Sequence, residues 1–198
     1  MKMNLTLSIV CAIGPVFLIF PSSALAHPMK GVGDFYAGML HPMTSVECVL
    51  PIIALSLLAG QQNRRTAIAI LLSFPIASAL AALLALVLPV SPFVAVINTS
   101  AMAVLGILVA LNRSLPLEIS VILSAVLGLT VGWANGGELT SDTSAYRFIP
   151  GLAVVGLLLI SYGIGLVRSL DMPWAKTAVR VTGSWIAAIG ILVLSLNK

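Results

Sequence analysis

The stretch TAIAILLSFPIASALAALLALVL, residues 66–88, decides the fold of this chain. It holds no charged side chain. Its length matches the roughly 20 apolar residues that a helix needs to cross about 30 Å of hydrocarbon. The stretch therefore predicts a transmembrane helix.

The rest of the chain has the same character. It is 60% hydrophobic and 8% charged, with a mean hydropathy of +1.14, which lies outside the range of soluble globular domains. The net charge of +4 does not indicate nucleic acid binding, because basic residues in such chains mostly flank membrane helices. We therefore predict an all-α fold, a polytopic helical bundle in the lipid bilayer, with six transmembrane helices at 42–59, 66–88, 93–111, 115–133, 148–167 and 178–196.

Residues 1–26 have the pattern of a cleaved signal peptide. Lys2 supplies a positive start, Leu5 to Phe20 form an apolar segment, and the small residues before position 27 fit a cleavage site. An uncleaved signal anchor is the alternative interpretation. Cleavage leaves residues 27–198 as a six-helix transmembrane domain and makes His27 the N-terminal residue.

The predicted cleavage removes one of the two cysteines. Cys11 is removed with the signal peptide, so Cys48 remains as the single thiol and cannot form an intramolecular disulfide. A lone cysteine in a membrane helix often serves only as a small apolar packing residue.

Basic residues predict the orientation. With the N-terminus outside, six of the nine lysines and arginines after the signal peptide face the cytoplasm, namely Arg64, Arg65, Arg113, Arg168, Lys176 and Arg180. That bias follows the positive-inside rule. It predicts a protein of the bacterial inner (cytoplasmic) membrane.

Two pairs of small residues predict places where helices approach closely. They are Gly128 with Gly132, and Ser161 with Gly165, each four positions apart. Small side chains at this spacing let membrane helices come into backbone contact.

A polar cluster precedes the first predicted membrane helix. The stretch HPMTSVEC, residues 41–48, places an imidazole, a carboxylate and a thiol at His41, Glu47 and Cys48. We expect the helix to begin near Pro42, which would place Glu47 about 10 Å below the outer surface. An intramembrane carboxylate indicates a functional site because an unpaired charge there is costly. The alternative is that Glu47 is protonated, or that a neighbouring hydroxyl or backbone group satisfies it.

A second polar cluster falls on the same side of the membrane, in the stretch GWANGGE, residues 132–138. Its glycines would let the backbone turn, and Asn135 and Glu138 could then offer oxygen ligands beside the first cluster. An ordinary helix end with a solvated loop is the alternative interpretation.

These residues resemble the HupE/UreJ family of membrane proteins. The family pattern at the first helix is roughly F-x-x-G-x-x-H-P-x-x-G-x-D-H, and Phe35, Gly38, His41 and Pro42 match it in spacing. A second family pattern, A-H-G-x-E, aligns with residues 134–138. The resemblance implies a secondary nickel or cobalt permease associated with the maturation of hydrogenase or urease.

The sequence departs from both family patterns. Ser45 replaces glycine, Glu47 replaces aspartate, Cys48 replaces histidine, and Asn135 replaces the histidine of the second pattern. Nickel and cobalt accept imidazole and carboxylate ligands, whereas thiolate and thioether ligands favour Cu(I) or zinc. The identity of the metal therefore stays open.

From the residues and the resemblance together we expect a permease for a divalent transition-metal ion, Ni²⁺ or Co²⁺ first, that enters from the outer side. His27 and His41 would capture the ion, Glu47 and Cys48 would hold it, and Asn135 and Glu138 would complete the site. The metal is cargo, and no permanently bound cofactor is expected. Partners would be a second copy of the chain or maturation proteins of the metalloenzyme.

The alternative functions are an accessory protein and an enzyme. A family relative without transport activity, serving as a membrane accessory or metal-chaperoning protein, would fit the loss of two motif histidines. An enzyme is disfavoured because the sequence lacks the H-E-x-x-H, G-x-S-x-G and phosphate-binding glycine motifs.

Overall fold

The computed structural model describes residues 33–196, and within them every regular element is a helix. The predicted signal peptide, with Cys11, and the predicted ligand His27 lie outside the described residues. In chain order the helices are α2 (Asp34–Thr44), α3 (Val46–Gln61), α4 (Arg64–Leu84), α5 (Phe93–Leu111), α6 (Leu117–Gly137), α7 (Ala145–Arg168) and α8 (Pro173–Leu196).

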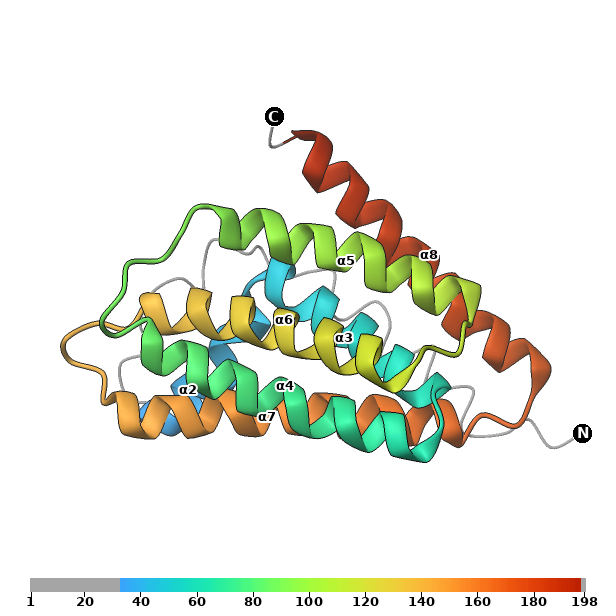
Figure 1. Ribbon diagram of the computed structural model, residues 1–198, viewed down its shortest axis with the longest axis horizontal. Coiled ribbons are helices and arrows are strands. Elements are labelled where there is room, and N and C mark those ends of the chain that lie inside the picture. Colours follow the sequence, from blue (N-terminus) through green and yellow to red (C-terminus); the bar gives the residue numbers. More distant parts are fainter. Residues whose placement is uncertain (1–32, 197–198) are drawn as a thin grey trace, which may run out of the picture.

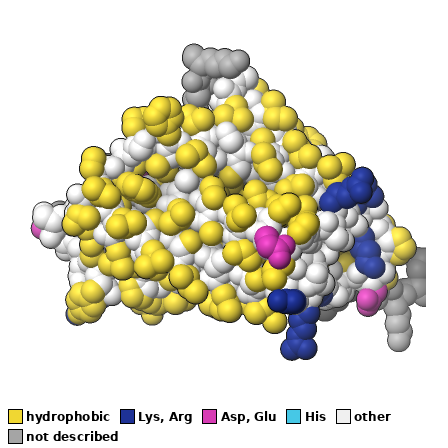
Figure 2. Space-filling view, viewed as in Figure 1, with side chains coloured by type: hydrophobic (Ala, Val, Ile, Leu, Met, Phe, Trp, Pro, Cys, Tyr) yellow, Lys and Arg dark blue, Asp and Glu magenta, His cyan; other side chains and the backbone are white. Residues whose placement is uncertain are grey.

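The predicted membrane helices agree with the structure at five places. The helices α4 to α8 are each long and apolar enough to cross a membrane. A sixth crossing is formed if α2 and α3 are counted as one broken span. Figure 2 shows the consequence on the surface, where one face is mainly hydrophobic and the lysines and arginines gather toward one end.

The predicted first helix, 42–59, is wrong as a single element. The chain bends by 86° between α2 and α3, at Ser45, whose backbone is extended with φ −105° and ψ 124°. Pro42 lies near the end of α2 and not in the first turn of a membrane helix. Proline has no N–H to continue the helical ladder. The carbonyl of Ser45 then accepts from the N–H groups of Cys48 and Val49, which begins α3.

The helix α3 runs through the centre of the bundle (Figure 1). It contacts α7 and α5 most extensively, and its side chains from Ala54 to Gly60 are all buried. The helices α4 and α6 form one closely packed pair, and α5 and α8 form another. With 16 residues α3 is shorter than α4 to α8, and its start lies inside the bundle, where α2 meets it (Figure 1).

Glycines set the closest helix contacts. A Cβ atom at Gly132 of α6 would collide with the carbonyl oxygen of Ser78 on α4, so the predicted close approach at Gly128 and Gly132 is confirmed. Gly165 has open space around it, so the prediction for the second small pair is wrong at that residue.

A reciprocal glycine contact joins α2 to α7. A Cβ atom at Gly38 would collide with the carbonyl oxygen of Phe148, and one at Gly151 would collide with that of Phe35. The backbone of each helix therefore lies against the glycine of the other. This contact fixes the direction of α2, and so it fixes the position of His41 one turn further along.

Candidate metal-binding site

The polar residues predicted from two distant stretches of sequence line one cavity. Its volume is about 450 Å³, and it lies between the Ser45 break, the start of α5 and the end of α6. The predicted residues on its wall are His41, Glu47, Cys48, Asn135 and Glu138.

The end of α6 differs from the predicted loop. The helix continues to Gly137, so Asn135 is a buried helical residue, 2% exposed. A Cβ atom at Gly136 would lie 2.7 Å from the backbone of Ala82 on α4. The glycines of this stretch therefore allow α6 to stay helical against α4 and do not turn the chain.

Asn135 has an orientation fixed by its hydrogen bonds. Its Nδ2 donates to the carbonyl oxygen of Val131 at 2.7 Å, and it lies 3.7 Å from Cys48 Sγ. The amide oxygen Oδ1 must then face the other way, where it lies 3.0 Å from His41 Nδ1. Asn135 thus connects the His41 side chain of α2 with the Cys48 thiol of α3.

His41 faces hydrogen-bond acceptors with both ring nitrogens. Its Nδ1 meets Asn135 Oδ1, and its Nε2 lies 3.1 Å from Glu138 Oε2. A neutral imidazole carries one N–H, so two acceptors match the doubly protonated cation. The ring also packs edge to face on Phe148, with centroids 5.7 Å apart.

The pair formed by His41 and Glu138 lies at the mouth of the cavity. The side chains are 34% and 67% exposed. The hydrogen bond from His41 lowers the pKa of the Glu138 carboxyl below its usual value, against the smaller opposing effect of burial. Glu138 therefore stays ionised in mildly acidic solution.

Glu47 occupies a different position from the one predicted. It lies in the first turn of α3 and not within a continuous membrane helix. Free N–H groups at a helix start favour a negative charge. Glu47 lines the cavity and is half-buried. Within the described residues it makes no ion pair shorter than 4.0 Å.

Sequence reasoning missed Asn98 on α5. This residue is 2% exposed and lines the cavity, and its Oδ1 lies 2.5 Å from the Thr130 hydroxyl of α6. The signal was present as an amide in the apolar run 93–111, since buried amides in membrane helices need partners. The predicted span treated that run as uniformly apolar.

The described residues do not gather three histidine, cysteine, aspartate or glutamate side chains into one metal-ligand cluster. The side chains of His41 and Glu138 lie together on one side of Asn135, and Cys48 lies on its other side. Glu47 lies on the same cavity wall. His41, Asn135 and Glu138 are thus hydrogen-bonded to one another, whereas Glu47 has no such side-chain partner among the described residues.

Comparison with known proteins identifies the family of the chain. The model of the family described as HupE / UreJ protein matches residues 16–193. The chain belongs to the HupE/UreJ family. It is similar to the protein named Protein HupE from Rhizobium leguminosarum bv. viciae, with 25% identity over 177 residues, 89% of this chain and 93% of that protein. No solved structure matches the chain.

Membership of the HupE/UreJ family confirms the resemblance drawn from His41, Pro42 and their neighbours. Together with the five long apolar helices it establishes a membrane protein. The roles of the individual cavity residues, the metal and the direction of movement remain predictions.

Proposed function

We propose that this HupE/UreJ protein is a secondary permease for a divalent transition-metal ion, with Ni²⁺ or Co²⁺ as the first candidates. The observation that carries the proposal is the shared cavity. Imidazole, carboxylate, thiol and amide groups from α2, α3 and α6 line a single space of about 450 Å³. In an apolar helical bundle such a concentration of ligand atoms indicates a path for a polar substrate.

The ligand types fit the proposed cargo. Imidazole and carboxylate ligands suit Ni²⁺ and Co²⁺, and His41, Glu47 and Glu138 supply them. A metal can bind His41 only after a ring nitrogen loses its proton. The ion would therefore replace the hydrogen bond between His41 and Glu138 and release a proton, which makes this pair, more than Glu47 alone, the proton-linked element.

Asn98 would extend the path inward from these ligands. Its amide is held by Thr130 at the α5 wall of the same cavity. The orientation of such an amide is set by its partners. Here the Thr130 hydroxyl donates to Asn98 Oδ1 and so fixes the amide at the cavity wall.

The setting of the site follows from the predicted topology. We place the cavity on the outer side of a bacterial inner membrane, with His27 near its mouth and movement driven by a gradient. Delivery to hydrogenase or urease maturation, with those proteins or a second copy of the chain as partners, is part of the same proposal.

Uptake of radiolabelled nickel by cells tests the transport function. We expect His41→Ala and Glu47→Gln to lower the initial uptake rate at least about tenfold, because the loss of even an outer-shell partner of a metal ligand costs about 10- to 100-fold. Glu118→Gln is the matched control, because Glu118 is exposed on the first turn of α6 at the other end of that helix. Wild-type uptake in both site variants at equal protein level would refute the proposal.

One observation favours a second function, a non-transporting accessory protein. His41 and Glu138 already satisfy each other, and two motif histidines are replaced by Cys48 and Asn135. Such a protein would bind no nickel, cobalt, copper or zinc when purified. Elemental analysis of wild type against Cys48→Ser separates the alternatives, since a copper-selective permease would lose its metal in the variant.

A further inference from the structure

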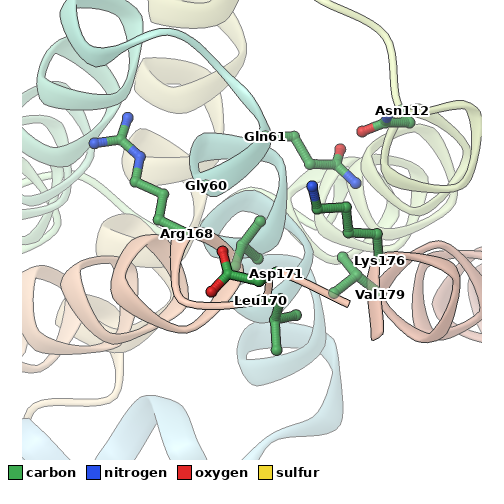
Figure 3. Close-up of a pocket in the computed structure, with 9 residues that line it drawn as sticks. Gly60, Gln61, Asn112, Arg168, Leu170, Asp171, Lys176 and Val179 are labelled. Carbon is green, nitrogen blue, oxygen red and sulfur yellow. The ribbon is translucent and has the colours of Figure 1, made fainter. Parts of the chain in front are cut away.

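A second cavity lies at the opposite end of α3. Its volume is about 340 Å³. It is bounded by the ends of α3, α5 and α7, the loop after α7 and the first turns of α8 (Figure 3). The polar residues on its wall are Gln61, Asn112, Arg168, Asp171 and Lys176. Neither family motif contributes to it.

Three helix C-termini give this cavity a field that favours cations. The helices α3, α5 and α7 end at Gln61, Leu111 and Arg168, and a helix C-terminus carries partial negative charge on its free carbonyls. The protein already directs N–H donors at these carbonyls. Arg180 Nε lies 2.9 Å from the Ala110 oxygen, and Arg168 Nη2 lies 3.3 Å from the Gln62 oxygen.

The remaining polar groups of the cavity are not paired with one another. Within residues 33–196 neither Asp171 nor Lys176 comes within 4.0 Å of an opposite charge. Gln61 Oε1 is buried without a hydrogen-bond donor in that part of the chain, although Gln61 Nε2 donates to Val109. Figure 3 shows the Lys176 amine directed toward the Gln61 amide, while the Arg168 guanidinium points away from the other labelled groups. Both signs of charge are therefore available to a ligand.

The cavity lies at the depth of lipid headgroups. It opens at the ends of three apolar spans, α5, α7 and α8, and the neighbouring Trp174 is 57% exposed. Tryptophan at such a position marks the membrane interface. Lysines and arginines gather toward one end of the face in Figure 2, which suits contact with lipid phosphates.

We infer that this cavity binds the headgroup of a phosphatidylethanolamine lipid. The primary ammonium would enter beside the C-terminus of α7 and donate to the Asp171 carboxylate, on the side of the cavity away from the Lys176 amine (Figure 3). The phosphate would remain at the rim beside Lys176. A phosphatidylglycerol headgroup would leave Asp171 and the helix C-termini without a cation. This inference does not depend on metal transport.

Mass spectrometry of the intact purified protein, titrated with defined lipids, tests the inference. Phosphatidylcholine is the matched ligand, since it has the same phosphate but no N–H on its nitrogen. We expect phosphatidylethanolamine to bind about tenfold more tightly, the value of one charge-assisted hydrogen bond. Asp171→Asn should remove that preference, and Lys176→Met should weaken both lipids.

The controls are Glu118→Gln and Arg65→Met, exposed charges at the same end of the bundle, which should bind as the wild type does. Free phosphoethanolamine should compete only weakly, because it lacks the acyl chains. Strong competition would instead show a soluble-ligand site and overturn the lipid assignment. Equal binding of the two lipids by the wild type, or no change in Asp171→Asn, would also overturn it.

Discussion

The two ends of α3 carry cavities of similar size, about 450 Å³ beside Cys48 and about 340 Å³ beside Gln61. At the first end, Asn135 and Glu138 accept hydrogen bonds from His41, and the Asn135 amide also contacts the Cys48 thiol. At the second, Asp171 and Lys176 have no ion pair in the described part of the chain. Polar groups in a membrane bundle can therefore be paired with one another or remain free for a ligand. We expect the two arrangements to respond differently to mutation.

The largest effect is expected where backbone contact positions the first cavity. Gly38→Val should lower the free energy of unfolding by about 3 kcal/mol or more, because no side-chain rotation relieves a collision with the Phe148 carbonyl. Thermal unfolding in detergent measures this. Gly165→Ala, at a helical glycine with open space, should change stability little or raise it. Similar losses in the two variants would mean that the contact between α2 and α7 does not hold α2.

The next effect compares an amide at each end. Asn135→Leu removes the partner of His41 and the contact with Cys48, and should cost about 2 kcal/mol. Gln61→Leu removes one hydrogen bond, and it also removes a buried acceptor that has no donor within the described residues. The resulting loss of stability should therefore stay below about 1 kcal/mol. The same unfolding assay compares them. A larger loss for Gln61→Leu would reverse the distinction between the two ends.

A smaller effect should follow pH at the first cavity. Because the pKa of Glu138 is lowered by His41, its contribution is complete above the usual carboxyl pKa and is lost as pH falls through the lowered value. The group is two-thirds exposed, so the loss should be under about 1 kcal/mol. The measurement is the difference in unfolding midpoint between the wild type and Glu138→Gln. This difference should become smaller as the pH is lowered from 7 into the acid range. A constant difference would contradict the pair.

The smallest effect is expected at the second cavity without lipid. Asp171→Asn and Lys176→Met should each change the stability of the delipidated protein by less than about 0.5 kcal/mol, since neither removes a contact within the described residues. Added phosphatidylethanolamine should then stabilise the wild type more than either variant. A large loss in lipid-free detergent would show that the two charges serve each other.

The sequence was most informative where length and hydrophobicity decide structure. The spans 93–111 and 148–167 correspond to α5 and α7 within three residues, because an apolar run of this length has few alternatives to a membrane helix. The break at Ser45 was not predicted. Pro42 suits the start of a helix as well as a place near its end, and the packing of Gly38 against α7, which holds α2 as a separate helix, is a tertiary contact that local sequence does not specify.

The candidate site, too, was predicted only in part. Motif spacing brought His41, Cys48 and Asn135 into one hypothesis, and all three line one cavity. Asn98 was missed because one amide in a long apolar run does not change the helix prediction. The second cavity could not be predicted, since its wall combines the ends of four helices from residues 60 to 179.

The reciprocal glycine contact has a mechanical consequence. At this contact the backbones of α2 and α7 touch directly, without flexible side chains between them. We therefore expect a tilt of α2 to move the start of α7 as well. The far end of that helix forms part of the second cavity through Val167 and Arg168. One continuous helix, α7, thus connects the α2 contact beside the first cavity with the wall of the second, and we expect a displacement of α2 to be transmitted along it.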